Sequence, residues 1–221
     1  MTRSRLKKVT RTSGFSLIEM LIVAMIIIIL TAGAIIQIKP MLKASRADAA
    51  VSYSLNQIRL ARERAIDERR LMRVTFTAPQ TILMEYQFTD PVSKVVSYLP
   101  VTLQAGQTGA GTITLPYDMQ FIVPPTKPAS APDLIGSQTT ALDFYCAGAA
   151  CAGTALYFNP DGSITNVNND PVQGVVYMAR TSDELSARAV SFLGPTGRAK
   201  AWRFLRVPSP PAATPTQWAQ Q

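Results

Sequence analysis

The longest apolar run in the sequence begins at Phe15 and extends to Ile38. Among these 24 residues Glu19 is the only charged side chain. As a helix rising about 1.5 Å per residue, the run would span roughly 36 Å, enough to cross a hydrocarbon core of about 30 Å. We therefore predict a transmembrane helix over 15–38. A lone acid in such a run costs on the order of 3 kcal/mol, so we interpret Glu19 as a functional residue.

The pattern changes after the apolar run. Lys39 and Pro40 predict a kink rather than the end of the helix, because proline removes a helical donor and crowds the preceding turn. Apolar residues then recur at steps of three and four, which predicts an amphipathic continuation of the helix over 39–70. The predicted buried stripe comprises Ala44, Ala47, Val51, Leu55, Ile58, Ala61 and Ala65.

From Met72 onward the apolar period becomes two, which is typical of strands. We expect strands over 72–77 and 82–88, then 95–103, 112–115, 119–123, 140–145, 155–158, 164–167, 173–179, 187–193 and 199–206. These segments define a β-rich domain over 71–207, and the Pro-rich tail 208–221 is expected to be disordered. A long helix followed only by strands predicts an α+β fold, with the helix packed on antiparallel sheet.

The distribution of charge predicts how the chain is oriented in the membrane. The formal net charge is +8, and the leader 1–14 carries five of the 22 basic residues. The remaining 17 basic and 14 acidic residues leave a balance of +3 after Gly14. Basic residues before an apolar segment keep that end in the cytoplasm, which sends the rest of the chain across the membrane. The whole-chain charge is therefore a topology signal and does not indicate nucleic-acid binding.

Three interpretations of the N-terminal stretch compete. A plain membrane anchor tolerates Glu19 without needing it, and a secretory signal fits the small residues Ala32-Gly33-Ala34 but has a shorter apolar core. The third rests on a resemblance. The stretch Gly14-Phe15-Ser16-Leu17-Ile18-Glu19 resembles the type IV prepilin processing motif that pilins share with type II secretion pseudopilins.

This resemblance implies cleavage between Gly14 and Phe15 by a prepilin peptidase, followed by N-methylation of Phe15. It implies that Glu19 pairs with the Phe15 ammonium of a neighbouring subunit, which relieves the cost of both charges in an apolar environment. The expected location is the bacterial inner membrane, with a single span and a periplasmic C-terminal domain. The expected partners are other pseudopilins or pilins, the peptidase and the assembly platform.

Later motifs narrow the resemblance to the GspH/FimT family of minor pseudopilins and minor pilins. They are Leu60-Ala61-Arg62-Glu63-Arg64-Ala65-Ile66, Tyr157-Phe158-Asn159-Pro160-Asp161-Gly162-Ser163-Ile164, Val190-Ser191-Phe192-Leu193 and Gly197-Arg198-Ala199-Lys200. The resemblance implies a pilin-like fold and a structural role in a type II secretion pseudopilus. The alternative is a FimT-type minor pilin that acts in pilus assembly or DNA uptake. A membrane-anchored binding protein that never polymerises is a third class, and Glu19 discriminates because only a filament needs it.

Catalytic equipment is sparse. The sequence has no histidine, so it offers neither a Ser-His-Asp nor a Cys-His arrangement, and it has no phosphate-binding loop. We expect no enzyme activity, no cofactor and no metal site. Asn159-Pro160-Asp161-Gly162 predicts a tight hairpin turn rather than a calcium site, because its oxygens are too few.

Two further features carry hypotheses. Cys146 and Cys151 cannot complete a zinc site alone, and export to an oxidising compartment favours a disulfide over two buried thiols. Arg198, Lys200, Arg203 and Arg206 form a basic cluster near the end of the strand region. They either coat a solvated strand or bind double-stranded DNA weakly, because Gly197-Arg198-Ala199-Lys200 resembles a Gly-Arg-x-Arg element of DNA-binding FimT-type pilins.

Overall fold

The computed structural model describes residues 16–101, 111–124, 127–128, 130–146, 148–151, 153–181, 183–206 and 216–221. Side chains at 33–40, 184, 206 and 216 are outside this description. The chain divides into two compact units, 1–42 and 43–221, which are described separately. The predicted cleavage site, Gly14 and Phe15, lies outside the described residues.

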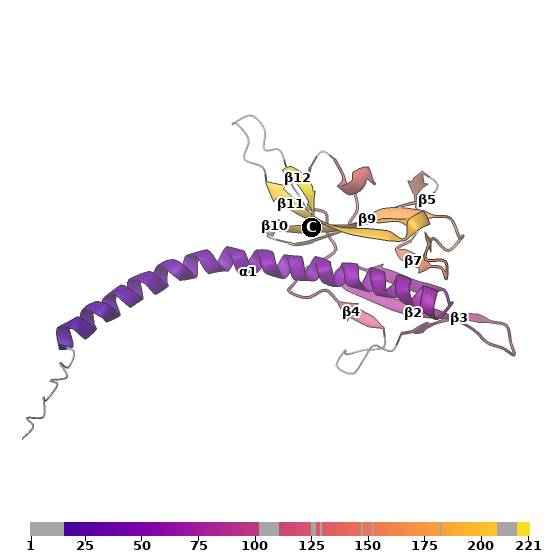
Figure 1. Ribbon diagram of the computed structural model, residues 1–221. Helices are drawn as coiled ribbons and strands as arrows, with labels where there is room; N and C mark the ends of the chain where they lie inside the picture. The colour runs from indigo at the N-terminus through magenta and orange to yellow at the C-terminus, as the bar shows by residue number, and fades with distance from the viewer. Residues whose placement is uncertain are drawn as a thin grey trace, which may run out of the picture. The chain divides into compact units, whose positions relative to one another are not determined.

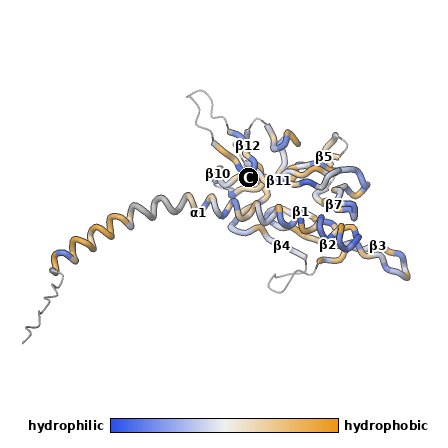
Figure 2. Tube along the Cα trace, in the orientation of Figure 1, coloured by the Kyte–Doolittle hydropathy of each residue, from blue (hydrophilic) through white to orange (hydrophobic). Residues whose placement is uncertain are grey.

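Helix α1 (Leu17–Asp67) begins in the first unit and ends in the second. It continues through Pro40, so the proline does not end the helix, as predicted. In the first unit the apolar side chains from Leu17 to Leu30 are exposed, and Figure 2 shows this part of α1 as hydrophobic. Within the described residues no helix combines the length and mean hydropathy that a membrane span requires. Part of the predicted span 15–38, namely Phe15 and the side chains from 33 onward, lies outside the described residues.

In the second unit two antiparallel sheets accompany the C-terminal half of α1 (Figure 1). The first sheet has the order β3-β2-β1-β7-β8, with β4 also paired to β2. Its strands are β1 (Met72–Thr77), β2 (Thr81–Thr89), β3 (Val96–Pro100), β4 (Thr112–Thr114), β7 (Ala155–Phe158) and β8 (Ile164–Thr165). The predicted α+β arrangement of a helix on antiparallel sheet is confirmed.

The second sheet has the order β12-β11-β10-β9-β5-β6. Its strands are β5 (Leu142–Cys146), β6 (Ala149–Ala150), β9 (Val172–Arg180), β10 (Asp183–Leu193), β11 (Arg198–Arg206) and β12 (Thr216–Gln220). Two short 3₁₀ turns, η1 (Pro132–Leu134) and η2 (Gly194–Thr196), complete the elements. The strand expected over 119–123 is wrong, because there only Gln120 makes an isolated bridge to Ala179.

The helix and both sheets share one core. Six of the seven predicted stripe residues of α1 are fully or nearly fully buried, from Ala47 to Ala65, and Ala44 is partly buried. They pack with Val74 and Met84 of the first sheet and Val176 and Val190 of the second. Alanines on this face allow the sheets to approach the helix closely, and burial of their apolar surface is the main stabilising contribution.

The predicted disordered tail is wrong for its last residues. Strand β12 pairs with β11 from Trp202↔Gln220 to Arg206↔Thr216, and Trp218 packs against Tyr177 and Phe204 at ring-centroid distances of 5.8 and 5.9 Å. The proline content of the tail suggested no buried surface. One tryptophan provides that surface because the aromatic pocket it enters comes from other strands. Residues 207–215 lie outside the description.

Candidate functional site

Glu19 lies in the first turn of α1 and is exposed. Its neighbours Leu17, Ile18 and Met20 are exposed as well. An acid at a helix N-terminus interacts favourably with the helix dipole, so this placement does not strain the helix. The Glu19 side chain is therefore exposed, and a charged group of another subunit can reach it.

Arg62, near the end of α1, joins two turns of the sheet region. Its Nε donates to the carbonyl oxygen of Gly162 at 3.0 Å, and its Nη2 donates to that of Thr196 at 3.2 Å. Gly162 closes the predicted Asn159–Gly162 hairpin turn, with its N–H donating to the Asn159 carbonyl at 2.9 Å. One planar guanidinium therefore holds the β7–β8 turn and the η2 turn against the helix.

Gly197 is required where it lies. Its φ is 61°, in the left-handed region, where residues other than glycine are strained. A Cβ atom there would also overlap the Gly162 carbonyl oxygen and Nε of Arg62. The glycine therefore creates the passage through which Arg62 reaches both turns.

A basic depression of about 350 Å³ opens beside this junction. It is lined by Arg59, Arg62, Glu63, Thr196, Gly197, Arg198 and Ala199. Arg59 and Arg198 are exposed and Arg62 is half-buried. Three guanidiniums thus meet at one depression, although they come from positions almost 140 residues apart in the sequence. We call this surface the arginine depression.

The predicted DNA-binding cations do not gather in one place. Lys200 contacts Asp133 with Nζ and Oδ1 2.5 Å apart, on the sheet face that carries Trp202. Arg203 is paired in register with the buried Arg188, on the face toward α1. Successive residues of a strand point to opposite faces, so Lys200 and Arg203 face opposite ways. Only Arg198 of the three lines the arginine depression, and the Arg206 side chain is outside the description.

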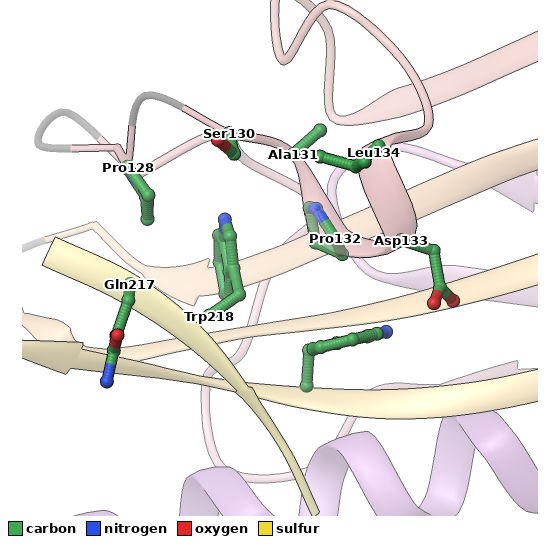
Figure 3. Close-up of a pocket in the computed structure, with 9 residues that line it drawn as sticks. Pro128, Ser130, Ala131, Pro132, Asp133, Leu134, Gln217 and Trp218 are labelled. Atoms are coloured by element: carbon green, nitrogen blue, oxygen red, sulfur yellow. The ribbon is translucent and has the colours of Figure 1, made fainter.

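A second cleft, of about 370 Å³, lies over the other face of the second sheet (Figure 3). Its apolar lining comes from Pro128, Ala131, Pro132, Leu134, Trp202 and Trp218, and its polar lining comes from Ser130, Asp133 and Gln217. Leu134 is 83% exposed. Asp133 and Leu134 both have positive φ, 52° and 59°, which is costly for residues other than glycine.

A polar network holds this strained turn in place. Trp202 Nε1 donates to Ser191 Oγ at 2.8 Å, and Ser191 Oγ donates to Asp133 Oδ2 at 2.5 Å. Lys200 contacts the other oxygen of the same carboxylate. Because Ser191 is buried, the network replaces the water that these groups would otherwise need. Lys200 therefore has a structural partner.

Arg188 is fully buried and joins β10 to the helix. Its Nε lies 2.6 Å from Asp48 Oδ1, its Nη1 donates to the carbonyl oxygens of Leu185 and Ala187, and its Nη2 donates to that of Ala44. Burial lowers the pKa of Arg188, while the Asp48 carboxylate acts to raise it. The carboxylate and three carbonyls compensate the guanidinium for lost hydration.

Cys146 and Cys151 are joined by a disulfide, with their Cα atoms 5.1 Å apart. The bridge spans the β5–β6 hairpin, and Asn166 Nδ2 donates to Cys146 Sγ at 3.3 Å. The disulfide closes a small hairpin, and neither cysteine lines the arginine depression.

Sequence reasoning missed the roles of Arg62 and Arg188. Arg62 stands in a family-like motif, but nothing in its neighbours indicates which carbonyls it meets. Arg188 is the only charged residue in the mostly apolar segment 187–193, and a lone charge in a buried strand pattern is the signal that could have found it.

Comparisons with known proteins add one finding. No family model matches the sequence, and no curated protein matches it. Among solved structures, the chain is similar to the minor pseudopilin EpsH of the type 2 secretion system of Vibrio cholerae. The TM-score is 0.43 at 12% identity, over 72% of this chain and 97% of that chain. At that level of similarity, the fold class rests on this chain's own elements.

Proposed function

We propose that this chain is a prepilin-like structural subunit of a membrane-anchored filament, acting as a minor pseudopilin in type II secretion. The observation that carries the proposal is α1. One continuous helix begins two residues after Phe15, exposes an apolar surface up to Leu30, and then buries an alanine-rich stripe in an α+β domain. Such a helix can pack against the helices of neighbouring subunits in an open helical array while each subunit keeps its own folded domain.

The prepilin motif supplies the assembly chemistry. Removal of residues 1–14 would create an amino group at Phe15, and its methylation would keep the charge. Glu19 is the single acid of the apolar segment, so the ammonium of a neighbouring subunit is its natural partner. The role is structural, in the inner membrane, with the β-rich domain in the periplasm and partners among other pseudopilins, the prepilin peptidase and the assembly platform.

Processing and assembly test this proposal separately. The full chain is produced in cells that contain a prepilin peptidase, and the mature N-terminus is read by mass spectrometry. We expect loss of 1–14 and a methylated Phe15. Glu19→Ala should be cleaved normally but recovered poorly in sheared filaments, whereas Asp67→Ala, which removes an exposed acid at the end of α1, should assemble. An uncleaved chain, or normal assembly of Glu19→Ala, would reject the filament role.

The second candidate is a FimT-type minor pilin with weak binding of double-stranded DNA. The exposed guanidinium of Arg198 favours it, and the contact of Lys200 with Asp133 counts against it. A gel shift with a DNA duplex at low salt separates the two candidates. DNA binding that is lost in Arg198→Ala supports the pilin, and the absence of any shift leaves the pseudopilin.

A further inference from the structure

The arginine depression has more positive charge than its surroundings neutralise. Within the described part of the chain, Arg59, Arg62 and Arg198 make no ion pair with any carboxylate. Glu63 is the only acid of the lining and is itself exposed. Three guanidiniums against one carboxylate leave a local excess of positive charge, which attracts an anionic group.

The depression is also organised in advance. Arg62 is held by the carbonyls of Gly162 and Thr196, and it passes so close to Gly197 that a Cβ atom there would overlap it. Arg59 lies one helical turn before Arg62 on the same face of α1, and Arg198 begins β11. Because Arg62 is already held by two hydrogen bonds, an incoming anion has to order only Arg59 and Arg198, which lowers the cost of binding.

The lining indicates the kind of anion. Guanidinium groups match carboxylates and phosphates by paired N–H donors. The depression contains no aromatic side chain on which a nucleic-acid base could stack. Its volume of about 350 Å³ suits one or two acidic side chains rather than a duplex.

We propose that the arginine depression is a docking site for an acidic segment of a partner protein, whose Asp or Glu side chains enter between Arg59 and Arg198. The site goes beyond the filament role because it does not require polymerisation. Charge complementarity is what selects this partner. Three guanidiniums gather at the depression without an ion pair, whereas Lys200 and Arg188 of the second sheet are already paired with carboxylates.

The test uses the full chain in detergent micelles and a fluorescent hexaglutamate peptide as the probe, followed by anisotropy at low salt. We expect saturable binding that weakens roughly tenfold or more in Arg59→Ala and in Arg198→Ala, which corresponds to about 1.4 kcal/mol. Arg46→Ala is the matched control, because it removes the same charge from an exposed position of the same helix. Its affinity should match that of the parent chain.

Other results overturn the proposal. The absence of binding rejects it. An equal loss of peptide affinity in Arg46→Ala would show that the peptide is attracted by the net charge of the protein and not by this site. Displacement of the peptide by a short DNA duplex that binds more tightly through Arg59 and Arg198 makes the site a nucleic-acid site. Glu19→Ala should bind hexaglutamate like the parent chain, so a failure of filament assembly does not affect this test. Thermal unfolding by circular dichroism verifies that each variant is folded.

Discussion

Arg62 of α1 occupies the space that a side chain at position 197 would need. Nε of Arg62 donates to the Gly162 carbonyl, and a Cβ on Gly197 would overlap both of those groups. The helix, the β7–β8 turn and the η2 turn therefore meet at one guanidinium and one glycine. Substitutions at these two residues should therefore be energetically coupled.

Gly197→Ala should destabilise the second unit by about 2 kcal/mol, because alanine is strained at a positive φ and must displace Arg62. Arg62→Ala should cost about 1 to 2 kcal/mol, since it removes two charge-assisted hydrogen bonds from a partly exposed position. Urea unfolding of the full chain in detergent measures both. The two costs should not add in the double variant, because each change breaks the same junction. Additive costs would contradict a shared junction.

Asp48→Ala should destabilise the protein by about 2 to 3 kcal/mol, because it leaves the buried Arg188 without its counter-ion. This expected loss of stability is smaller than that for breaking a fully buried ion pair, because the Asp48 side chain is 37% exposed. Urea midpoints compare the variant with Asp67→Ala, which removes an exposed carboxylate from the same helix. Arg188→Met combined with Asp48→Ala should cost less than Asp48→Ala alone. A larger cost would mean that the ion pair itself, and not the stranded charge, sets the energy.

Tyr177→Phe should leave stability unchanged or raise it by about 1 kcal/mol, because the change removes a polar group that costs energy when buried without a hydrogen bond. Tyr177 is fully buried, and its hydroxyl has no hydrogen-bond partner among the described residues. Equilibrium unfolding at neutral pH measures the change. A clear loss of stability would show that the hydroxyl is bonded after all.

The same residue predicts a loss of stability in alkali. Burial raises the pKa of Tyr177, with smaller contributions from Asp143 and Tyr145. Above a pH of about 10 the unfolded tyrosine loses its proton while the folded one keeps it, so stability falls as pH rises. Tyr177→Phe should flatten this alkaline fall, whereas Tyr117→Phe, at an exposed position, should not. Parallel curves for all three proteins would contradict the burial of Tyr177.

Cys146→Ser should lower stability by about 2 kcal/mol under oxidising conditions, because the bridge limits the unfolded chain over only a short loop. Thermal unfolding of the parent chain with and without reductant provides the comparison. The reduced parent should behave like the variant, and thiol titration should find two reactive thiols only after reduction. Two titratable thiols in the untreated protein would show that the bridge does not form.

Local patterns were enough for much of the fold. The stripe from Ala47 to Ala65 is buried, the period of two from Met72 onward forms β1 and β2, and Asn159–Gly162 closes a hairpin. Each of these features depends on residues a few positions apart, whose spacing alone selects helix, strand or turn. The last strand escaped this reasoning because Trp218 is stabilised by side chains from β9 and β11.

The sequence by itself determined the apolar helix with its single acid and the α+β class. Only the tertiary structure decided which charges meet. It places Arg198 beside Arg59 and Arg62, pairs Lys200 with Asp133, and buries Arg188 against Asp48. The physical reason is register: a shift of one residue in a strand sends a side chain to the opposite face, and that register is set by strand pairs distant in the sequence.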